Sequence, residues 1–218
     1  VGSDVSGVGT VRKFLTATGY GVGLAVFAYG ILADNAGVTS LKNLVNSSGV
    51  VADDVTGVGS ARYAPAAARY GSSGQALFGF GANLDSPYNL SMTNLVSNVG
   101  VIGTDVSGVG TDRAYLGCTG YGDDKAIFAY GETNTEVSMS NLVSNSGVVA
   151  SDVTGVGTAR ISAEAARYGS DKGIFAYGNN GGVTAVSNLV SNSGVIASDV
   201  TGVGTARKHA AAAGYSTA

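Results

Sequence analysis

The sequence is poor in the residues that most often build catalytic, metal or disulfide sites. Its 218 residues include one cysteine, Cys118, one histidine, His209, two prolines and no tryptophan. A single cysteine cannot form an intrachain disulfide, and one cysteine with one histidine cannot supply the ligand sets typical of zinc sites. A nucleophile of the Ser-His or Cys-His type would depend on that one histidine. We therefore expect no enzyme activity, no cofactor and no metal centre.

Charge is also scarce, because Asp, Glu, Lys and Arg make up only 12% of the chain and leave a net charge of −3. A protein that neutralises nucleic-acid phosphates needs a basic surface, which this composition does not offer. Apolar runs stay well below the ~18 residues that span a bilayer. The sequence therefore predicts no nucleic-acid partner and no membrane insertion, while its 44% of hydrophobic residues suffices for a core.

What the sequence does have is a repeat, and the repeat decides its organisation. The string Asp-Val-[Ser/Thr]-Gly-Val-Gly recurs at spacings of 50, 51, 47 and 47 residues. It begins at Asp4, Asp54, Asp105, Asp152 and Asp199. An Arg follows each Asp after eight residues, at Arg12, Arg62, Arg113, Arg160 and Arg207, and a Tyr follows each Arg after eight more. Residues 1–218 are therefore expected to form one domain of tandem repeats.

Each repeat contains short segments that favour strands. Phe-x-[Tyr/Phe]-Gly and Asn-Leu-Val segments are bounded by turn residues, as in 174–177 and 186–190. Ala-rich stretches such as 210–213 could be helical by propensity, but they are far shorter than the ~12 residues that an isolated helix needs. We expect four strands per repeat, called a to d. Strand a is expected to be innermost, with Ala165, Ala166, Ala211 and Ala212 buried.

The order of these features resembles the kelch family of β-propellers. In the unit that starts at Arg160, an Arg precedes a small-residue strand, an apolar strand ends in Gly178, and a variable loop leads to Asn188. Two features differ from kelch repeats: one glycine follows strand b instead of two, and the strand-d Trp is absent. The resemblance implies an all-β propeller of four-stranded, kelch-like blades, with four complete units and a partial fifth.

The repeats are also nearly identical to one another. Residues 141–160 and 188–207 differ at one position in twenty, Val149 against Ile196. Such arrays are similar to repeat proteins of marine bacteriophages and uncultured viruses, which implies a virion or extracellular surface location.

The chain starts with a d strand at 2–5 and ends with an a strand at 206–215, so it holds five a and five d strands but only four b and four c strands. We therefore expect either a longer array or a neighbouring copy that supplies the missing strands. The alternative is a ring of four complete blades whose surplus strands pair elsewhere.

The Asp and Arg of each repeat admit two interpretations. Five copies could line a polar channel or an anion site, or the Asp could cap a turn and the Arg could hold the loop in place by a charge-assisted bond. We favour the second interpretation, because a ligand site is usually built once. The Ser/Thr-Gly-Val-Gly loop lacks the lysine and the following helix of a phosphate-binding loop, so it predicts a tight turn. His209 is read as a surface residue, and Cys118 as a small buried hydrophobic residue.

The repeats differ mainly in the b-to-c loops, which are 12, 12, 9 and 9 residues long at 31–42, 82–93, 132–140 and 179–187. Loops on a rigid frame often carry binding residues, although loops also drift where nothing constrains them. The candidate binding residues are polar, with one aromatic. They are Asp34, Asn35, Asn83, Asp85, Tyr88, Glu132, Asn134, Glu136, Asn179 and Asn180.

Two functions fit this pattern. The first is a non-enzymatic propeller that displays its b-to-c loops to a protein or glycan partner, or serves as a structural part of a virion or its tail. The second is a lectin-like module with one carbohydrate site per blade. An enzyme that uses a central channel is disfavoured because the sequence lacks the catalytic residue sets. A homo-oligomer or a larger assembly is compatible with either function.

Overall fold

The computed structural model describes residues 6–86 and 88–214. This part of the chain is all-β, with four three-stranded antiparallel sheets, one two-stranded sheet and one short 3-10 helix, η1 (Ala33–Asn35). No helix in the described ranges is long and apolar enough to cross a membrane. The expected all-β class is therefore confirmed. The expected strand at 2–5 and Tyr215 lie outside the described residues.

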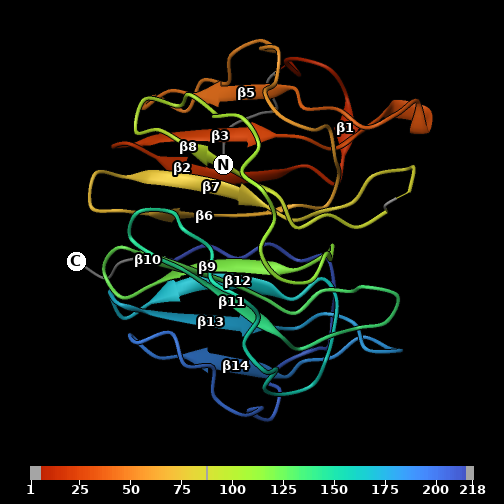
Figure 1. Cartoon of the computed structure of the whole chain (residues 1–218), viewed down its shortest axis with the longest axis vertical. Coiled ribbons are helices and arrows are strands. Elements are labelled where there is room, and N and C mark those ends of the chain that lie inside the picture. The colour runs from red at the N-terminus through yellow and green to blue at the C-terminus, as the bar shows by residue number, and fades with distance from the viewer. Residues whose placement is uncertain (1–5, 87, 215–218) are drawn as a thin grey trace.

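Each repeat contributes one three-stranded sheet, in which the second strand lies in the middle (Figure 1). Sheet 1 consists of β2 (Thr16–Tyr20), β3 (Leu24–Ala28) and β5 (Lys42–Val45). Sheet 2 consists of β6 (Ala66–Tyr70), β7 (Gln75–Gly79) and β8 (Thr93–Val96). Sheet 3 consists of β9 (Gly117–Tyr121), β10 (Lys125–Ala129) and β11 (Ser140–Val143). Sheet 4 consists of β12 (Glu164–Tyr168), β13 (Lys172–Ala176) and β14 (Ser187–Val190), and β1 (Arg12–Lys13) pairs with β4 (Ile31–Leu32).

The expected fourth strand of each repeat is a segment held by two isolated bridges. In sheet 2 the bridges join Thr93 to Val106 and Val96 to Ile102. Between them, the side chain of Asn94 donates a hydrogen bond from Nδ2 to the carbonyl oxygen of Gly103 at 3.0 Å. The asparagine amide occupies a position that a regular ladder would give to a backbone N–H. The prediction of four regular strands is therefore wrong in detail, although the fourth segment does lie beside the third strand.

The core lies between neighbouring sheets and is built from the Phe-x-[Tyr/Phe] segments. The middle-strand Phe of one sheet packs edge to face against an aromatic ring of the preceding sheet. The ring centroids are 5.3 Å apart for Tyr29 and Phe78, 5.0 Å for Phe80 and Phe128, and 5.4 Å for Tyr130 and Phe175. Each sheet thus buries its aromatic side chains by packing on the next one in the chain.

The first strands of the four sheets pack side by side in chain order, from β2 through β6 and β9 to β12. Together with Ala212 and Gly214 they line one cavity of about 650 Å³, here called the central cavity. Ala165 and Ala166 are only half-buried, and Ala211 and Ala212 are exposed. The expected burial of these alanines is therefore wrong, because a cavity open to solvent lies where close packing was expected. Residues 210–213 form neither the disfavoured helix nor the expected strand.

Candidate functional site

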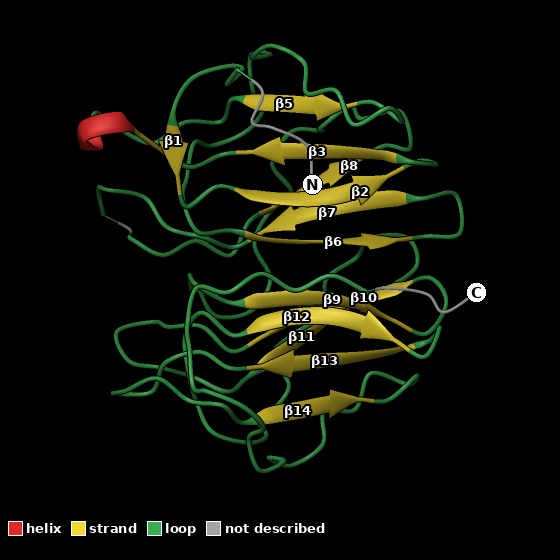
Figure 2. Cartoon of the chain, turned by 180° about the vertical axis from the view of Figure 1, so that it is seen from behind, coloured by secondary structure: helices red, strands yellow, loops and turns green. Residues whose placement is uncertain are grey.

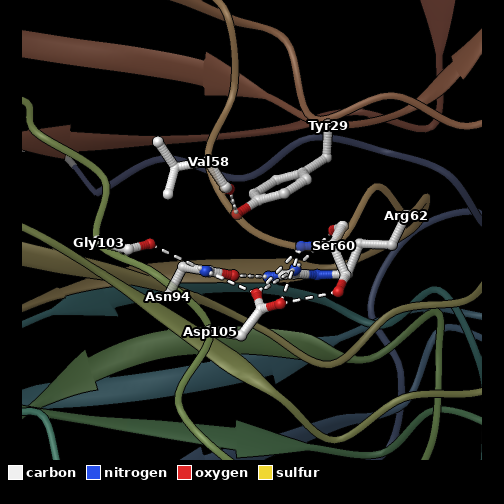
Figure 3. Close-up of polar contacts among 7 residues, drawn as sticks. All are labelled: Tyr29, Val58, Ser60, Arg62, Asn94, Gly103 and Asp105. Carbon is white, nitrogen blue, oxygen red and sulfur yellow. Dashed lines mark hydrogen bonds and ion pairs between the residues drawn. The ribbon is translucent and has the colours of Figure 1, made fainter.

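The repeated Arg, Asp and Asn residues form one cluster per sheet, which we call the triad; its Asn is buried in every sheet and its Arg in sheets 2 to 4, whereas its Asp reaches the surface. In sheet 2, Arg62 donates from Nη2 to Asn94 Oδ1 at 2.7 Å, and Asn94 donates from Nδ2 to Asp105 Oδ1 at 2.9 Å (Figure 3). Asp105 also accepts hydrogen bonds from the backbone N–H and the hydroxyl of Ser60, the latter at 2.7 Å. Although burial raises the pKa of Asp105, these bonds from Ser60 and Asn94 hold it below its ordinary value. The triad thus ties the start, the third strand and the fourth segment of one repeat together.

The arginine of the triad also joins each sheet to the preceding one. The guanidinium of Arg62 lies 4.1 Å from the ring centroid of Tyr29, and the Arg62 carbonyl accepts a hydrogen bond from Gly30 N at 2.9 Å. The same stacking recurs at 4.4 Å for Arg113 on Phe80, 3.8 Å for Arg160 on Tyr130 and 4.4 Å for Arg207 on Tyr177. The preferred structural interpretation of these arginines fits this geometry.

The ion-pair partner is not the Asp eight residues before each Arg. Arg12 pairs with Asp54 at 3.3 Å, and Arg113 pairs with Asp152 at 3.4 Å. In sheets 1 to 3 the Arg therefore pairs with the Asp that closes its own sheet, one repeat further along the chain. In sheet 4, Arg160 is connected to the corresponding Asp199 through Asn188. The pKa of Asp54 is lowered to about 2 by hydrogen bonds to its carboxylate, of which the bond from the Thr10 hydroxyl has the largest effect. Burial acts in the opposite direction but is outweighed.

The Gly-Val-Gly turn packs directly against the triad. Gly59 has a φ of +83°, and a Cβ at this position would lie 2.5 Å from Asn94 Nδ2. A positive φ and a close neighbour both favour glycine. The Ser/Thr-Gly-Val-Gly string was interpreted as a tight turn rather than a phosphate-binding loop, and its close packing on the Asn and Asp of the triad agrees with that interpretation.

The four b-to-c loops lie on one side of the molecule, to the left in Figure 2. The segment that leads into each first strand lies beside them, because Tyr63 bridges Ala82 and Ala114 bridges Glu132. Six of the ten candidate residues are exposed: Asp34, Asn35, Asp85, Tyr88, Asn134 and Asn180. Four are half-buried: Asn83, Glu132, Glu136 and Asn179. None of the ten lines the central cavity.

Some polar loop residues stabilise the loops themselves. Asn83 Oδ1 accepts the backbone N–H of Leu84 at 2.7 Å, as in a local turn. Asn89 donates from Nδ2 to the carbonyl oxygen of Thr133 at 2.8 Å and joins the second loop to the third. Burial, and then the nearby charge of Glu136, raise the pKa of Glu132 above its ordinary value. Asn89 was not among the candidate residues, since nothing in its local sequence indicates a contact 44 positions away.

A second set of residues varies between the repeats outside the b-to-c loops, and the sequence analysis took it for unconstrained surface variation. Two residues after each repeat Arg, the backbone adopts a φ between +48° and +55°. This positive-φ slot holds Phe14, Ala64, Tyr115, Ser162 and His209. The slots are linked in series by backbone hydrogen bonds from Ala64 N to Phe14 O at 2.8 Å and from Ser162 N to Tyr115 O at 2.9 Å. Glycine adopts such a φ at the lowest cost, so its absence from all five slots indicates that the side chains themselves have a role.

Three slot residues and Tyr63 form an aromatic cluster. The ring of Phe14 lies 6.3 Å from Tyr63, 6.0 Å from Tyr115 and 6.4 Å from His209, between centroids. Phe14, Tyr115 and His209 line a pocket of about 250 Å³ with Ser162 and Glu164, here called the aromatic pocket. The hydroxyl of Ser162 is buried there and has no hydrogen-bond partner among the described residues. His209 is exposed, as expected of a surface residue, but it belongs to this cluster.

Cys118 lies in the wall shared by the aromatic pocket and the central cavity. Its side chain is half-buried rather than fully buried, so the interpretation as a small buried hydrophobic residue holds only in part. Burial raises the pKa of its thiol well above the ordinary value. A thiol with a raised pKa is a poor nucleophile at neutral pH.

Glu164 provides a test of the pocket's environment. Burial raises the pKa of this carboxyl to about 7. The folded state therefore binds the proton more tightly than the unfolded state, and the stability that this proton supplies is lost as the pH rises from 4.5 through 7. We expect Glu164→Gln to raise the melting temperature at pH 8 by a few degrees, about 1 kcal/mol after solvent screening. At pH 4.5 the change should be small, because the wild-type carboxyl is then protonated.

Calorimetry at the two pH values measures this difference. Asp85→Asn removes an exposed carboxyl from a loop and serves as the control, with no change expected at either pH. Equal shifts for Glu164→Gln at both pH values would contradict the burial of this carboxyl.

Comparison with known proteins adds no assignment, since no family model and no curated protein matches the chain. Within residues 6–86 and 88–214, no group of three His, Cys, Asp or Glu side chains is arranged to hold a metal ion. The geometry of the loops, the triads and the aromatic pocket therefore carries the functional argument.

Proposed function

We propose that the four sheets and the segment around Ala212 are blades of a kelch-like β-propeller, with four complete blades and part of a fifth. Two observations support this architecture. The four first strands and Ala212 all line the central cavity, as innermost strands do in a propeller. The rings of Phe14 and His209 lie 6.4 Å apart, which brings the first and last described repeats together.

On this scaffold we propose a non-enzymatic module that presents its b-to-c loops to a protein or glycan partner. The observation that carries the proposal is the division of polar residues between two roles. The repeated Arg, Asn and Asp groups bond to one another within the triads, whereas the variable b-to-c loops lie together on one side (Figure 2) and expose six of their ten candidate residues. A binding module needs this separation of a constant frame from variable contacts.

The near-identity of the repeats, with one difference in twenty between 141–160 and 188–207, is the feature shared with phage repeat proteins. On this ground we propose that the module belongs to a virion surface or tail. Self-association into a larger assembly is part of the same proposal.

A loop graft tests the display function. Replacing 82–93 by 132–140 exchanges one displayed loop for another that already exists in the chain. Because the triads are untouched, we expect a changed profile on a glycan array or a changed sedimentation velocity, with a nearly unchanged melting temperature. Asn89→Ala is the matched control, since the graft also removes the bond from Asn89 to Thr133. Identical binding and assembly before and after the graft would show that the loops vary without function.

The second candidate is a lectin-like module. The aromatic pocket favours it, because aromatic rings beside the Glu164 carboxyl suit the apolar face and the hydroxyl groups of a sugar. This geometry supports one site per chain, whereas the repeat pattern predicts one per blade. Calorimetric titration with an array-selected glycan distinguishes them by stoichiometry, and a glycan array without any binding would rule out the lectin-like function.

A further inference from the structure

The fourth residue of the first strand alternates between glycine and arginine from one sheet to the next. This position holds Gly19 in β2, Arg69 in β6, Gly120 in β9 and Arg167 in β12. All four residues line the central cavity. The alternation places two arginines in sheets 2 and 4, each next to a sheet that has glycine at the same position.

Each arginine extends over the glycine of the preceding strand. A Cβ added to Gly19 would lie 3.5 Å from Arg69 Cδ, and one added to Gly120 would lie 2.8 Å from Arg167 Cδ. Arg69 Nη2 donates to the Gly21 carbonyl oxygen at 2.7 Å. The two glycines therefore provide the space in which the arginine side chains lie.

Arg167 is held in the corresponding way. Its Nη2 donates to the carbonyl oxygens of Gly122 at 2.8 Å and Ser170 at 2.6 Å. Gly21 and Gly122 occupy the turn after the first strand of sheets 1 and 3, so both guanidinium groups lie at the turn end of the central cavity. This end is opposite to the b-to-c loops, which the chain reaches after the second strand.

No carboxylate balances these charges in the cavity wall. The other described residues that line the central cavity are Gly, Ala, Ser, Thr, Tyr and Cys. Acidic residues on the nearby turns bond to lysines instead, as Asp124 does to Lys125 at 3.4 Å and Asp171 to Lys172 at 3.1 Å. A guanidinium has five N–H donors, and the bonds to turn carbonyls use only those of Nη2.

We infer that the turn end of the central cavity binds an oxyanion, a phosphate or carboxylate group, through Arg69 and Arg167. Guanidinium groups match the geometry of such anions with paired hydrogen bonds. An anion there would also supply the negative charge that the described cavity lining lacks. The site is separate from the loops and does not depend on what they bind.

The test uses the full chain and inorganic phosphate, titrated calorimetrically against chloride at matched ionic strength. Arg69→Gly and Arg167→Gly each introduce the residue that Gly19 and Gly120 already provide in neighbouring strands. We expect each single variant to weaken phosphate binding about tenfold or more, as the loss of charge-assisted bonds implies, and the double variant to abolish it. Succinate in place of phosphate distinguishes a carboxylate site from a phosphate site.

Lys13→Gln removes an exposed positive charge on β1, at the b-to-c loop end and outside the cavity lining, and should leave phosphate binding unchanged. The double variant Arg69→Lys with Arg167→Lys keeps the charges if the glycine variants unfold, and it should bind phosphate more weakly than wild type. The inference is overturned if wild-type protein binds phosphate no better than chloride, or if the double glycine variant binds as wild type does. The loop graft should not alter phosphate binding, so this result is independent of the proposed display function.

Discussion

Replacing Arg113 by methionine should lower the free energy of unfolding by about 3–5 kcal/mol, the usual cost of breaking a buried charge network by removing one partner. The Arg113 side chain is completely buried and stacks on Phe80 at 4.4 Å. Its Nη2 donates to Asn141, its Nη1 to Asp152 at 3.4 Å and its Nε to the Tyr130 carbonyl oxygen at 3.1 Å. Methionine preserves much of the volume but removes the Arg113 donors from Asn141 Oδ1 and from the Tyr130 carbonyl oxygen. Asp152 keeps its hydrogen bonds from Thr111 and Asn141 but loses its ion pair. Chemical denaturation monitored by circular dichroism measures the loss.

Arg207→Met is the matched control, because Arg207 occupies the same position in its repeat but is exposed. It stacks on Tyr177 at 4.4 Å and donates to the hydroxyl of that ring at 3.3 Å. Exposed contacts of this kind contribute about 1 kcal/mol or less. Equal losses at the two positions would mean that burial within the triad is not what stabilises the sheets.

The second large effect is expected from Gly57→Ala, at the first glycine of a Gly-Val-Gly turn. A Cβ there would overlap the backbone of Ser40 and lie 2.5 Å from its Oγ. The neighbour is backbone, which cannot move aside as a flexible side chain can. We expect a loss of about 3 kcal/mol in the free energy of unfolding, the upper part of the range for forcing a methyl group into filled space.

Gly7→Ala tests the same glycine of the repeat in a different environment, because a Cβ at Gly7 meets nothing within 4 Å. This variant should change the free energy of unfolding by less than about 0.5 kcal/mol. The difference between the two melting temperatures separates crowding from the intrinsic cost of replacing glycine. If Gly57→Ala were as harmless as Gly7→Ala, the packing of the turn on Ser40 would be wrong.

Much of the fold follows from the repeat in the sequence, since the register of Asp, Arg, Tyr and Asn marks where each three-stranded sheet begins and ends. The pairing of these residues could not be predicted. The Asp eight residues before Arg62 is Asp54, but Arg62 forms its ion pair with Asp105 at 4.0 Å. The constant spacing of the repeats is compatible with either Asp as the partner of Arg62. Asp105 is the partner because the fourth segment folds back beside the third strand of the same sheet.

The candidate site was predictable only in part. Loop length and composition indicate the exposed residues, because variation in a repeat protein is visible by comparing its own repeats. The slot two residues after each repeat Arg varies in the same visible way, but the sequence does not show that its five residues share a positive φ. Nor does it show that Phe14, Tyr115 and His209 line one pocket, because they come from different repeats.

The stacking of each triad arginine on the preceding sheet makes every contact between neighbouring sheets nearly the same. Arg62, Arg113 and Arg160 each meet an aromatic ring at about 4 Å and an asparagine of their own sheet. A duplication or deletion of one whole repeat by recombination would therefore join two surfaces that already fit. The number of repeats can change in a single genetic event without redesign of the core, whereas a change of half a repeat would separate every arginine from its aromatic partner.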